Sequence, residues 1–397
     1  MKILFVLSIS LDRQGPSVHL LEAMMEALVN KGHTVHILQK DTRGPLPLIP
    51  ESLPLDKVTC ETIPSAFEPK GSFVKRYLID VRYALALKRL YKKHKDCDAV
   101  FLQSSNVAGI KMFFIKRILK KKVLFNVQDI FPNNAACINA ISRKSLAYRV
   151  LNIPQKYAYK HADTIITISD DMKKTLEKEG AAPEKVKVVY NWSYSDNPYD
   201  IKDEDNIFLR DAGILDTRFK VVYAGKIGAL QSVQTVADAA KILRDVSDIH
   251  FYIIGDGISK NSLVTNVENS GGEENITFMD IQPPKYAPHI YSMANVNIIP
   301  LAPNIITTAL PSKTATVLSC GRPIIACVGK DSEFGKKLAG YKGCFVTDSG
   351  DANALAEAVL QIKNSDKECE SRMFFTECFQ KSVNAATYAD ELISLCK

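Results

Sequence analysis

The stretch Leu310-Pro-Ser-Lys-Thr-Ala-Thr-Val-Leu-Ser-Cys-Gly-Arg-Pro-Ile-Ile-Ala-Cys-Val-Gly329 decides the fold of this chain. Its centre predicts a helix that begins near Ser312 and Lys313 and ends at Gly321, followed by a buried strand over 323–328. The start of a helix offers unpaired backbone N–H groups and a partial positive charge, which suit an anion such as a diphosphate. A phosphate-binding helix that leads into a parallel strand indicates a nucleotide-dependent α/β enzyme.

The same alternation of apolar strands and amphipathic helices runs along most of the chain and restarts once. A stretch over 193–205, rich in Pro, Asn, Ser and acidic residues, has no periodicity and is typical of a linker. We therefore predict two doubly wound parallel-sheet domains, 1–195 and 206–367, followed by a helical segment over 368–397. The predicted strands are 2–9, 34–38, 99–103, 122–126, 164–169, 186–190, 220–224, 249–254, 276–279, 296–300, 323–328 and 343–346.

The composition is that of a globular protein of 397 residues, with 46% hydrophobic and 24% charged residues. No apolar run approaches the roughly 20 residues that span a bilayer. The stretch Met1–Ser10 superficially resembles a signal peptide, but it lacks a cleavage site and is better explained as a first buried strand. The nine cysteines are scattered without a CxxC pair, which favours reduced thiols in a cytoplasmic protein.

Positive charge is concentrated in one part of the chain. Residues 72–124 contain 14 lysines and arginines against 3 acidic residues, and aliphatic and aromatic side chains lie between them. This mixture suits an anionic membrane surface; the alternative is a solvated helix face packed on its own sheet. Nucleic-acid binding is disfavoured, because no base-stacking platform or known binding module is visible. We expect peripheral contact with the inner face of the cell membrane.

Three strand ends in the second half are candidates for a nucleotide site. Open α/β sheets bind ligands at the carboxyl ends of their strands, and glycine lets the backbone approach a phosphate closely. Two ends are the turns Tyr223-Ala-Gly225-Lys226-Ile-Gly228 and Ile254-Gly255-Asp-Gly257, and the third is Pro311-Ser312-Lys313. Because Lys226 and Lys313 could also neutralise phosphate charge, the three together predict a nucleotide site.

The first half offers looser candidates. Gly15 and Ser17 follow the first strand and either lie against a ligand or form an ordinary turn in which Ser17 caps the next helix. Asp129 follows another strand and either orients a sugar hydroxyl or caps the next turn. Both pairs of alternatives stay open at this point.

Some patterns are discounted. Asp96-Cys-Asp98 matches a metal-binding DxD pattern, but it precedes a strand and is better explained as a solvated turn. His33 and His36 flank a strand start and are expected at the surface. No Walker P-loop, zinc signature or Ser-His-Asp array is recognisable, and no metal ligand is predicted.

The motifs together resemble a family. The two glycine turns, Pro311–Lys313 and Ser319-Cys-Gly-Arg-Pro323 are similar to those of GT4-type retaining glycosyltransferases, which have the GT-B fold. Within that family the chain resembles the bacterial branch that builds capsule and O-antigen chains, including fucosamine transferases. The agreement extends to Val127-Gln-Asp-Ile-Phe-Pro132, Val189-Tyr-Asn-Trp192 and Lys330-Asp-Ser-Glu333, and so covers nearly the whole chain.

The resemblance implies two Rossmann-like domains with a cleft between them, and a C-terminal helix that returns to the first domain. It implies a UDP-sugar donor, held mainly by the second domain without a metal or other cofactor, and a lipid-linked oligosaccharide acceptor held by the first. Retention would proceed without a protein nucleophile, so the protein positions the substrates and stabilises charge. The implied donor ligands are Gly15, Gly225, Lys226, Gly228, Gly255, Gly257, Pro311, Ser312 and Lys313, and the implied catalytic residues are Asp129, Lys313 and Thr316.

Two positions depart from the family pattern. The broader family carries two glutamates with seven residues between them, and the corresponding positions here lie at Thr308 and Thr316. A threonine still forms hydrogen bonds but is shorter and uncharged. Beside a retaining hexosyltransferase acting on an amino sugar, two alternatives therefore stay open: a non-catalytic partner subunit of another transferase, and a UDP-sugar epimerase of the same fold.

Overall fold

The computed structural model describes residues 1–13, 15, 17–65, 73–271, 274–365 and 368–397. Ser72, the first residue of the basic segment 72–124, lies outside this part of the chain. The chain forms two compact units. Unit 1 comprises Met1–Asn191 and Lys381–Lys397, and unit 2 comprises Trp192–Gln380.

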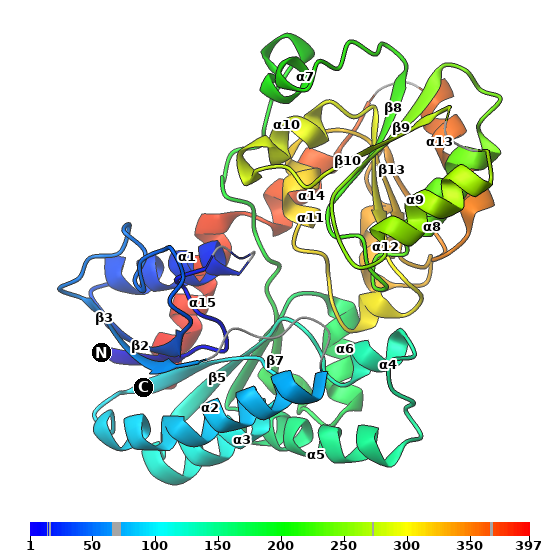
Figure 1. Cartoon of the computed structure of the whole chain (residues 1–397). Helices are drawn as coiled ribbons and strands as arrows, with labels where there is room; N and C mark the ends of the chain where they lie inside the picture. Colours follow the sequence, from blue (N-terminus) through cyan, green and yellow to red (C-terminus); the bar gives the residue numbers. More distant parts are fainter. Residues whose placement is uncertain (14, 16, 66–72, 272–273, 366–367) are drawn as a thin grey trace. The chain divides into compact units, whose positions relative to one another are not determined.

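Unit 1 is built on a seven-stranded sheet in which all neighbouring strands are parallel (Figure 1). The strand order is β3-β2-β1-β4-β5-β6-β7, so the chain first winds one way from β1 and then the other. The central strands are fully buried because helices cover both faces. The strands are β1 (Lys2–Val6), β2 (Thr34–Asp41), β3 (Val58–Pro64), β4 (Ala99–Gln103), β5 (Lys122–Val127), β6 (Thr164–Thr167) and β7 (Val186–Val188).

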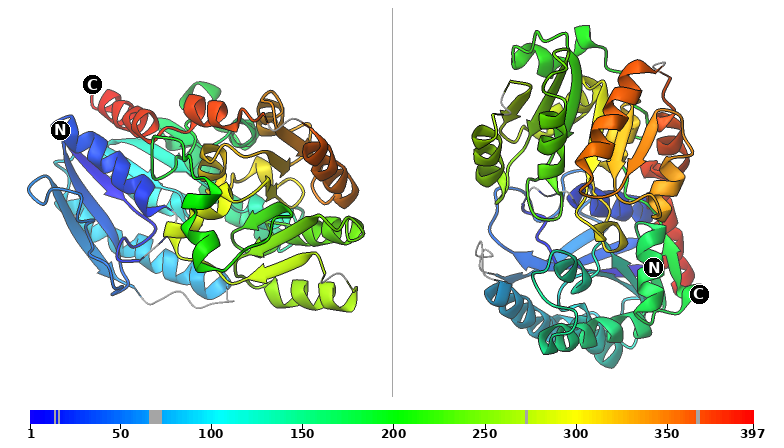
Figure 2. Two further views of the ribbon diagram at one scale, coloured as in Figure 1. Left: turned by 90° about the horizontal axis from the view of Figure 1, so that it is seen from above. Right: turned by 90° about the vertical axis from the view of Figure 1, so that its right-hand side faces the viewer.

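Two groups of helices sandwich this sheet. Helices α1 and α15 lie side by side on one face, and α2, α3 and α5 lie on the other (Figures 1 and 2). The helices are α1 (Val18–Asn30), α2 (Phe73–Lys93), α3 (Ala108–Phe114), the π-helical η1 (Ile115–Leu119), α4 (Asn133–Cys137), α5 (Leu146–His161), α6 (Asp170–Lys178), the 3-10 turn η2 (Pro183–Lys185) and α15 (Lys381–Leu395).

Unit 2 repeats the architecture with a six-stranded parallel sheet in the order β10-β9-β8-β11-β12-β13. Helices α8, α9 and α13 cover one face, and α10, α11 and α14 lie on the other (Figure 1). The strands are β8 (Phe219–Ala224), β9 (Ile249–Ile254), β10 (Ile276–Met279), β11 (Val296–Pro300), β12 (Ile324–Cys327) and β13 (Cys344–Thr347). The helices are α7 (Ile207–Asp211), α8 (Val233–Ile242), α9 (Lys260–Asn269), α10 (Ala287–Ser292), α11 (Thr314–Ser319), α12 (Glu333–Leu338), α13 (Ala352–Asn364), α14 (Ser371–Cys378) and the 3-10 turns η3 (Asp203–Asp205), η4 (Pro284–Tyr286) and η5 (Ile305–Thr307).

Two doubly wound parallel sheets confirm the predicted fold class. Several elements had no counterpart in the prediction, among them strand β3 and helices α5, α9 and α13. Over the described residues, none of the helices combines the length and the apolar character needed to cross a bilayer.

Candidate functional site

The carboxyl ends of β8 and β9 lie side by side in unit 2, and the turns that follow them pack backbone to backbone. The amide of Gly225 donates to Ile254 O at 2.9 Å, and that of Ile227 donates to Asp256 O at 2.8 Å. The two glycine turns found in the sequence therefore form one continuous surface at the carboxyl edge of the sheet, where α/β proteins place their ligands.

The glycines of the second turn are required by this packing. A Cβ at Gly255 would lie 1.8 Å from Gly225 O, and a Cβ at Gly257 would lie 2.1 Å from Ile227 O. Both residues also have a positive φ, 156° and 157°, which disfavours any side chain. Their direct role is to let the two turns meet, which brings the backbone of Gly225 and Gly228 to the sheet edge.

Lys313 joins the third motif to the first. Its Nζ donates to Ala224 O at 3.0 Å and lies 3.8 Å from the centroid of the Tyr223 ring. A Cβ on Gly225 would be 3.4 Å from the same Nζ. The long side chain thus reaches from the segment before α11 to the end of β8 and brings a cation beside the glycine turn.

The ammonium of Lys313 is well suited to receive an anion. An ammonium has three N–H donors, and among the described residues only Ala224 O accepts one of them. Burial lowers the pKa of Lys313 to about 7, although the residue keeps some exposure. An arriving diphosphate would favour the charged form, because an opposite charge nearby raises the pKa of a lysine. Lys226, in the adjacent turn, is exposed.

The segment before α11 follows the sequence prediction with one difference at its start. Helix α11 begins at Thr314, so Ser312 and Lys313 precede its first turn, and Ser312 is exposed. Gly321 ends the segment with a φ of 69°, as the prediction of a glycine stop requires. Strand β12 then follows after two residues. Pro311, Ser312 and Lys313 are therefore presented together at the carboxyl edge of the sheet.

The two threonines that depart from the family pattern are used inside the protein. Thr308 is fully buried and its hydroxyl donates to Ile305 O at 3.0 Å. The hydroxyl of Thr316 is 3.3 Å from that of Ser193. The Thr308 hydroxyl is thus bonded to the 3-10 turn η5 that precedes it, whereas Thr316 keeps partial exposure.

The first-half candidates all lie at the ends of strands in unit 1. Gly15 is half-buried, and a Cβ there would meet nothing within 4 Å. Ser17 stands at the N-cap position of α1, as the turn alternative has it, but its side chain forms no capping hydrogen bond. Asp129 follows β5, and its carboxyl group, which no described residue hydrogen-bonds, has its pKa raised to about 6 by burial. The Asp129 side chain therefore does not cap the turn that follows it.

A buried lysine in unit 1 was missed from the sequence. Lys111, on α3, is 1% exposed; its Nζ donates to Ser8 Oγ at 2.8 Å and lies 5.0 Å from the Tyr83 ring centroid. Nearby, Lys40 and Asp80 form an ion pair at 2.8 Å, also buried. The signal was a single lysine within the apolar run Val107–Ile115. Lys111 was counted among the basic residues of 72–124, but because it is buried it contributes no positive charge to the surface of that segment.

Of the discounted patterns, one was interpreted correctly and one was not. Asp96 and Asp98 are exposed and bind Lys2, through its Nζ and its amide, at 2.8 and 2.7 Å. They hold the amino ends of β1 and β4, which confirms the structural interpretation. His36, expected at the surface, is buried with 6% exposure because helix α2 and its C-terminal turn cover this part of β2.

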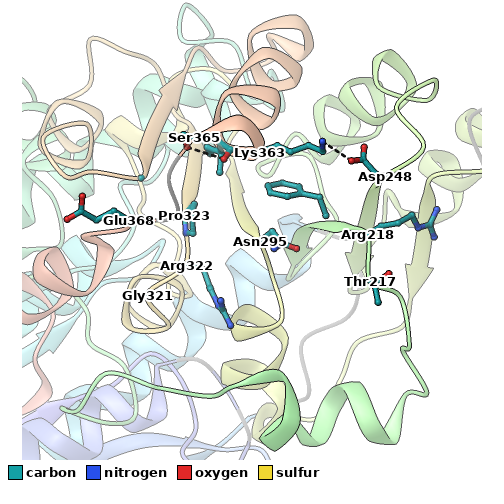
Figure 3. A pocket seen from close by; sticks show the side chains of 13 residues that line it. Thr217, Arg218, Asp248, Asn295, Gly321, Arg322, Pro323, Lys363, Ser365 and Glu368 are labelled. Atoms are coloured by element: carbon teal, nitrogen blue, oxygen red, sulfur yellow. Dashed lines mark hydrogen bonds and ion pairs between the residues drawn. The ribbon is translucent and has the colours of Figure 1, made fainter.

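A cavity of about 400 Å³ lies at the opposite, amino edge of the unit 2 sheet (Figure 3). Two of its cations are already ion-paired: Lys363 with Asp248 of the lining at 2.8 Å, and Arg218 with Asp216 outside the lining at 3.0 Å. It lies far along the strands from the glycine turns, and ligands of this architecture bind at the other edge. We therefore assign the candidate site to the carboxyl edge.

Comparison with known proteins agrees with this architecture. Residues 15–192 match the family model Glycosyltransferase Family 4, and residues 218–365 match the model Glycosyl transferases group 1. The second match contains both glycine turns and the segment with Lys313. WbjE of Pseudomonas aeruginosa, named as a glycosyltransferase, is 24% identical over 60% of this chain and 59% of its own length. WcaI of Escherichia coli, named as a glycosyl transferase of colanic acid biosynthesis, is 27% identical over 47% of this chain and 46% of its own length. The chain thus spans about half to three fifths of the length of these relatives.

Solved structures share the whole architecture. HepE of Anabaena, in complex with UDP and glucose, has a TM-score of 0.71 at 15% identity and covers 99% of this chain and 100% of its own. Sucrose-phosphate synthase of Thermosynechococcus elongatus has a TM-score of 0.69 at 15% identity, over 100% of this chain and 96% of its own. At such identities the likeness establishes the fold alone.

Proposed function

This chain belongs to the glycosyltransferases with the GT-B fold, and on that premise we propose that it transfers a sugar from a UDP-sugar to a lipid-linked oligosaccharide, with retention at the anomeric carbon. The product is a surface polysaccharide of the capsule or O-antigen kind. The donor sugar is an N-acetylated amino sugar or a 6-deoxy amino sugar, because the motifs resemble the branch that includes fucosamine transferases.

One observation carries the proposal: Lys313 extends to the turn after β8, where its Nζ lies 3.0 Å from Ala224 O. A diphosphate at this edge would meet that ammonium, the exposed Ser312 and Lys226, and the backbone of the Gly225 turn. The complex of HepE with UDP and glucose supports a nucleotide-sugar donor in this fold.

The chemistry follows from what these groups offer. In a retaining transfer without a protein nucleophile, negative charge develops on the departing diphosphate, and Lys313 would stabilise it. Asp129, just after β5, would accept a hydrogen bond from the acceptor through its carboxylate and orient the acceptor hydroxyl. Thr316, with its hydroxyl beside Ser193, would contact the donor in place of a glutamate. No metal is needed in this scheme.

The surface of unit 1 supports an acceptor at a membrane. Val74, Leu78 and Leu85 are 66%, 52% and 43% exposed on α2, and their spacing places them along one face of the helix. A groove of about 710 Å³ beside them is lined by apolar side chains together with Lys88, Arg89 and Lys92, and by no acidic residue among those described. Such a surface suits anionic lipid, and we propose a peripheral position on the inner face of the cell membrane.

The donor site is tested by calorimetric titration of the full chain with UDP. Replacing Lys313→Met removes one charge-assisted hydrogen bond, worth about 1.5–3 kcal/mol, and should weaken UDP binding by roughly 10- to 100-fold. Lys241→Met, at an exposed lysine on α8, is the control and should bind UDP like the wild type. A purified protein that neither binds UDP nor hydrolyses any UDP-sugar would overturn the proposal.

A second function, a non-catalytic partner subunit of another transferase, is favoured by one observation. The Thr308 hydroxyl is bonded to the turn that precedes it and Thr316 is paired with Ser193, so neither position supplies a carboxylate. This alternative predicts UDP binding without turnover until a second transferase is added. Robust sugar transfer by the isolated chain would exclude it.

A further inference from the structure

Three potential metal ligands meet at the edge of the unit 1 sheet. His36 comes from β2, Glu61 from the edge strand β3, and His94 from the turn after α2. Glu61 Oε1 is 2.7 Å from His94 Nε2 and 3.7 Å from His36 Nε2, and the two imidazoles stack with centroids 3.9 Å apart. Among the described residues this is the one group of three such side chains whose ligand atoms lie within 4.8 Å of one another.

The cluster is enclosed, and two of its imidazole nitrogens, His36 Nε2 and His94 Nδ1, are buried without a hydrogen-bond partner. His36 and His94 are 6% and 7% exposed. His36 Nε2 is buried without a hydrogen-bond partner, and it faces the carboxylate of Glu61. A buried polar atom without a partner is costly, and an ion between the imidazole and the carboxylate would remove that cost.

Two of the three side chains, His36 and Glu61, have hydrogen-bond partners outside the cluster of the kind that metal sites use. His36 Nδ1 is 2.7 Å from Thr59 Oγ1, which fixes the ring and directs Nε2 inward. The second carboxylate oxygen, Glu61 Oε2, accepts from Lys93 at 3.0 Å, which leaves Oε1 for the cluster. Ligating histidines and carboxylates are commonly held by such second hydrogen bonds.

Unit 2 contains an internal comparison. His250 on β9 lies 2.8 Å from Thr277 on its edge strand β10, as His36 does with Thr59 on β3. His250 also has one buried nitrogen without a partner, so that feature alone does not mark a site. In unit 2, a cross-strand His–Thr pair links the edge strand to its neighbour without a second histidine or a glutamate. Linking the edge strand therefore does not explain why unit 1 has Glu61 and His94 beside its own His–Thr pair.

We propose that His36, Glu61 and His94 bind a divalent transition-metal ion, Zn²⁺ or another ion that prefers nitrogen and oxygen ligands. The ligand atoms are Nε2 of each histidine and Oε1 of Glu61. In a tetrahedral zinc site, ligand atoms lie about 3.3 Å apart, and the two separations to Oε1, 2.7 and 3.7 Å, bracket that value. The imidazoles turn out of their stack on binding, and water supplies the fourth ligand.

The ion would be structural. It would join β2, β3 and the end of α2, and so fasten the edge strand that lines the basic groove of unit 1. This role is independent of the proposed sugar transfer, because none of the three residues is among the donor or acceptor ligands.

The test is metal binding by the full chain, stripped with a chelator and then dialysed against Zn²⁺. The wild type should retain one equivalent, and His94→Gln and Glu61→Gln should each weaken binding by about 100-fold or more, since each removes a direct ligand. His250→Gln is the matched control, because it removes the corresponding His–Thr pair in unit 2, and it should bind Zn²⁺ like the wild type.

Co²⁺ spectroscopy on the wild type tests the ligand set without relying on variants that fold poorly. Nitrogen and oxygen ligands give visible d–d bands without a strong near-ultraviolet thiolate band. A thiolate band would assign the ion to some of the nine cysteines and overturn the proposal. Failure of the wild type to retain Zn²⁺, or full retention by the His94→Gln/Glu61→Gln double variant, would overturn it equally.

Discussion

Lys111 places a potential charge inside unit 1, and its titration should appear in the stability of the protein. Burial lowers the pKa of Lys111 to about 7, with Asp80 raising it and Lys40 lowering it. In the unfolded chain a lysine titrates near 10.4. Between these values the unfolded state binds more protons, so the stability of the wild type rises with pH by up to about 1.4 kcal/mol per unit.

Replacing Lys111→Met should remove this dependence. Relative to the wild type, the variant should be most stable at pH 7 and below, where the buried ammonium is charged, and its advantage should shrink towards pH 10. Urea unfolding at a series of pH values measures this difference. Lys57→Met, at an exposed lysine of unit 1, should show no such trend; a difference for Lys111→Met that stays constant with pH would contradict the prediction.

Gly255 is the residue on which the meeting of the two donor turns depends. Gly255→Ala would put a methyl group 1.8 Å from Gly225 O at a φ of 156°. Gly213→Ala is a control for backbone conformation alone, since it has a φ of 63° and open space around it. We expect the control to lose about 1–2 kcal/mol and Gly255→Ala to lose about 1–3 kcal/mol more from overpacking, measured by chemical unfolding. Equal losses would mean that the turns are not tightly packed.

At the scale of single elements, helix α2 is expected to contact lipid. Leu78→Asp with Leu85→Asp introduces charges on its exposed apolar face and should reduce flotation with anionic vesicles several-fold, because charged groups resist burial at the lipid interface. Replacing Lys120, Lys121 and Lys122 by Gln should weaken flotation mainly at low salt. Leu215→Asp is the control, since this leucine of unit 2 is 92% exposed. Flotation unchanged in all variants would indicate a solvated face.

Two elements without a sequence counterpart, β3 and α5, were missed for different physical reasons. Strand β3 (Val58–Pro64) lies at the sheet edge, where most of its side chains keep some exposure, so it lacks the apolar run that marked the central strands. Helix α5 contains Pro154, which ordinarily argues against a helix interior. Interior strands and glycine-stopped helices, by contrast, follow directly from local pattern.

The separate motifs of the candidate site could be predicted from the sequence, but the contacts between them could not. Glycine at the ends of β8 and β9 is a local signal, and the rule on carboxyl ends places both turns on one edge. The bond from Lys313 to Ala224 joins residues 89 positions apart, and the burial of His36 depends on a helix far along the chain. Neither contact leaves a mark in local periodicity.

At the scale of the whole molecule, α15 is part of the core of unit 1. Tyr388 is fully buried and donates to Asn126 Oδ1 at 3.0 Å, and Asn384 donates to Tyr190 O at 2.9 Å. Tyr388→Ala should therefore destabilise unit 1 by about 3–5 kcal/mol, as large-to-small changes of buried aromatic residues do.

Native-state hydrogen exchange locates this effect. Amides of β4 and β5, against which α15 packs, should exchange faster in Tyr388→Ala, whereas those of β8 and β9 keep their protection. Met373→Ala, at a residue of α14 that is 53% exposed, should leave both sets unchanged. Equal acceleration in both units would mean that they unfold as one body.

The return of α15 also sets an order of events at the ribosome. Unit 2 is contiguous, from Trp192 to Gln380, whereas unit 1 needs residues 381–397, which are synthesised after all of unit 2. Domains generally fold as units during synthesis. The unit that begins the chain is therefore the later one to be completed, and until then the faces of β4 and β5 that receive Tyr388 stay open to chaperones.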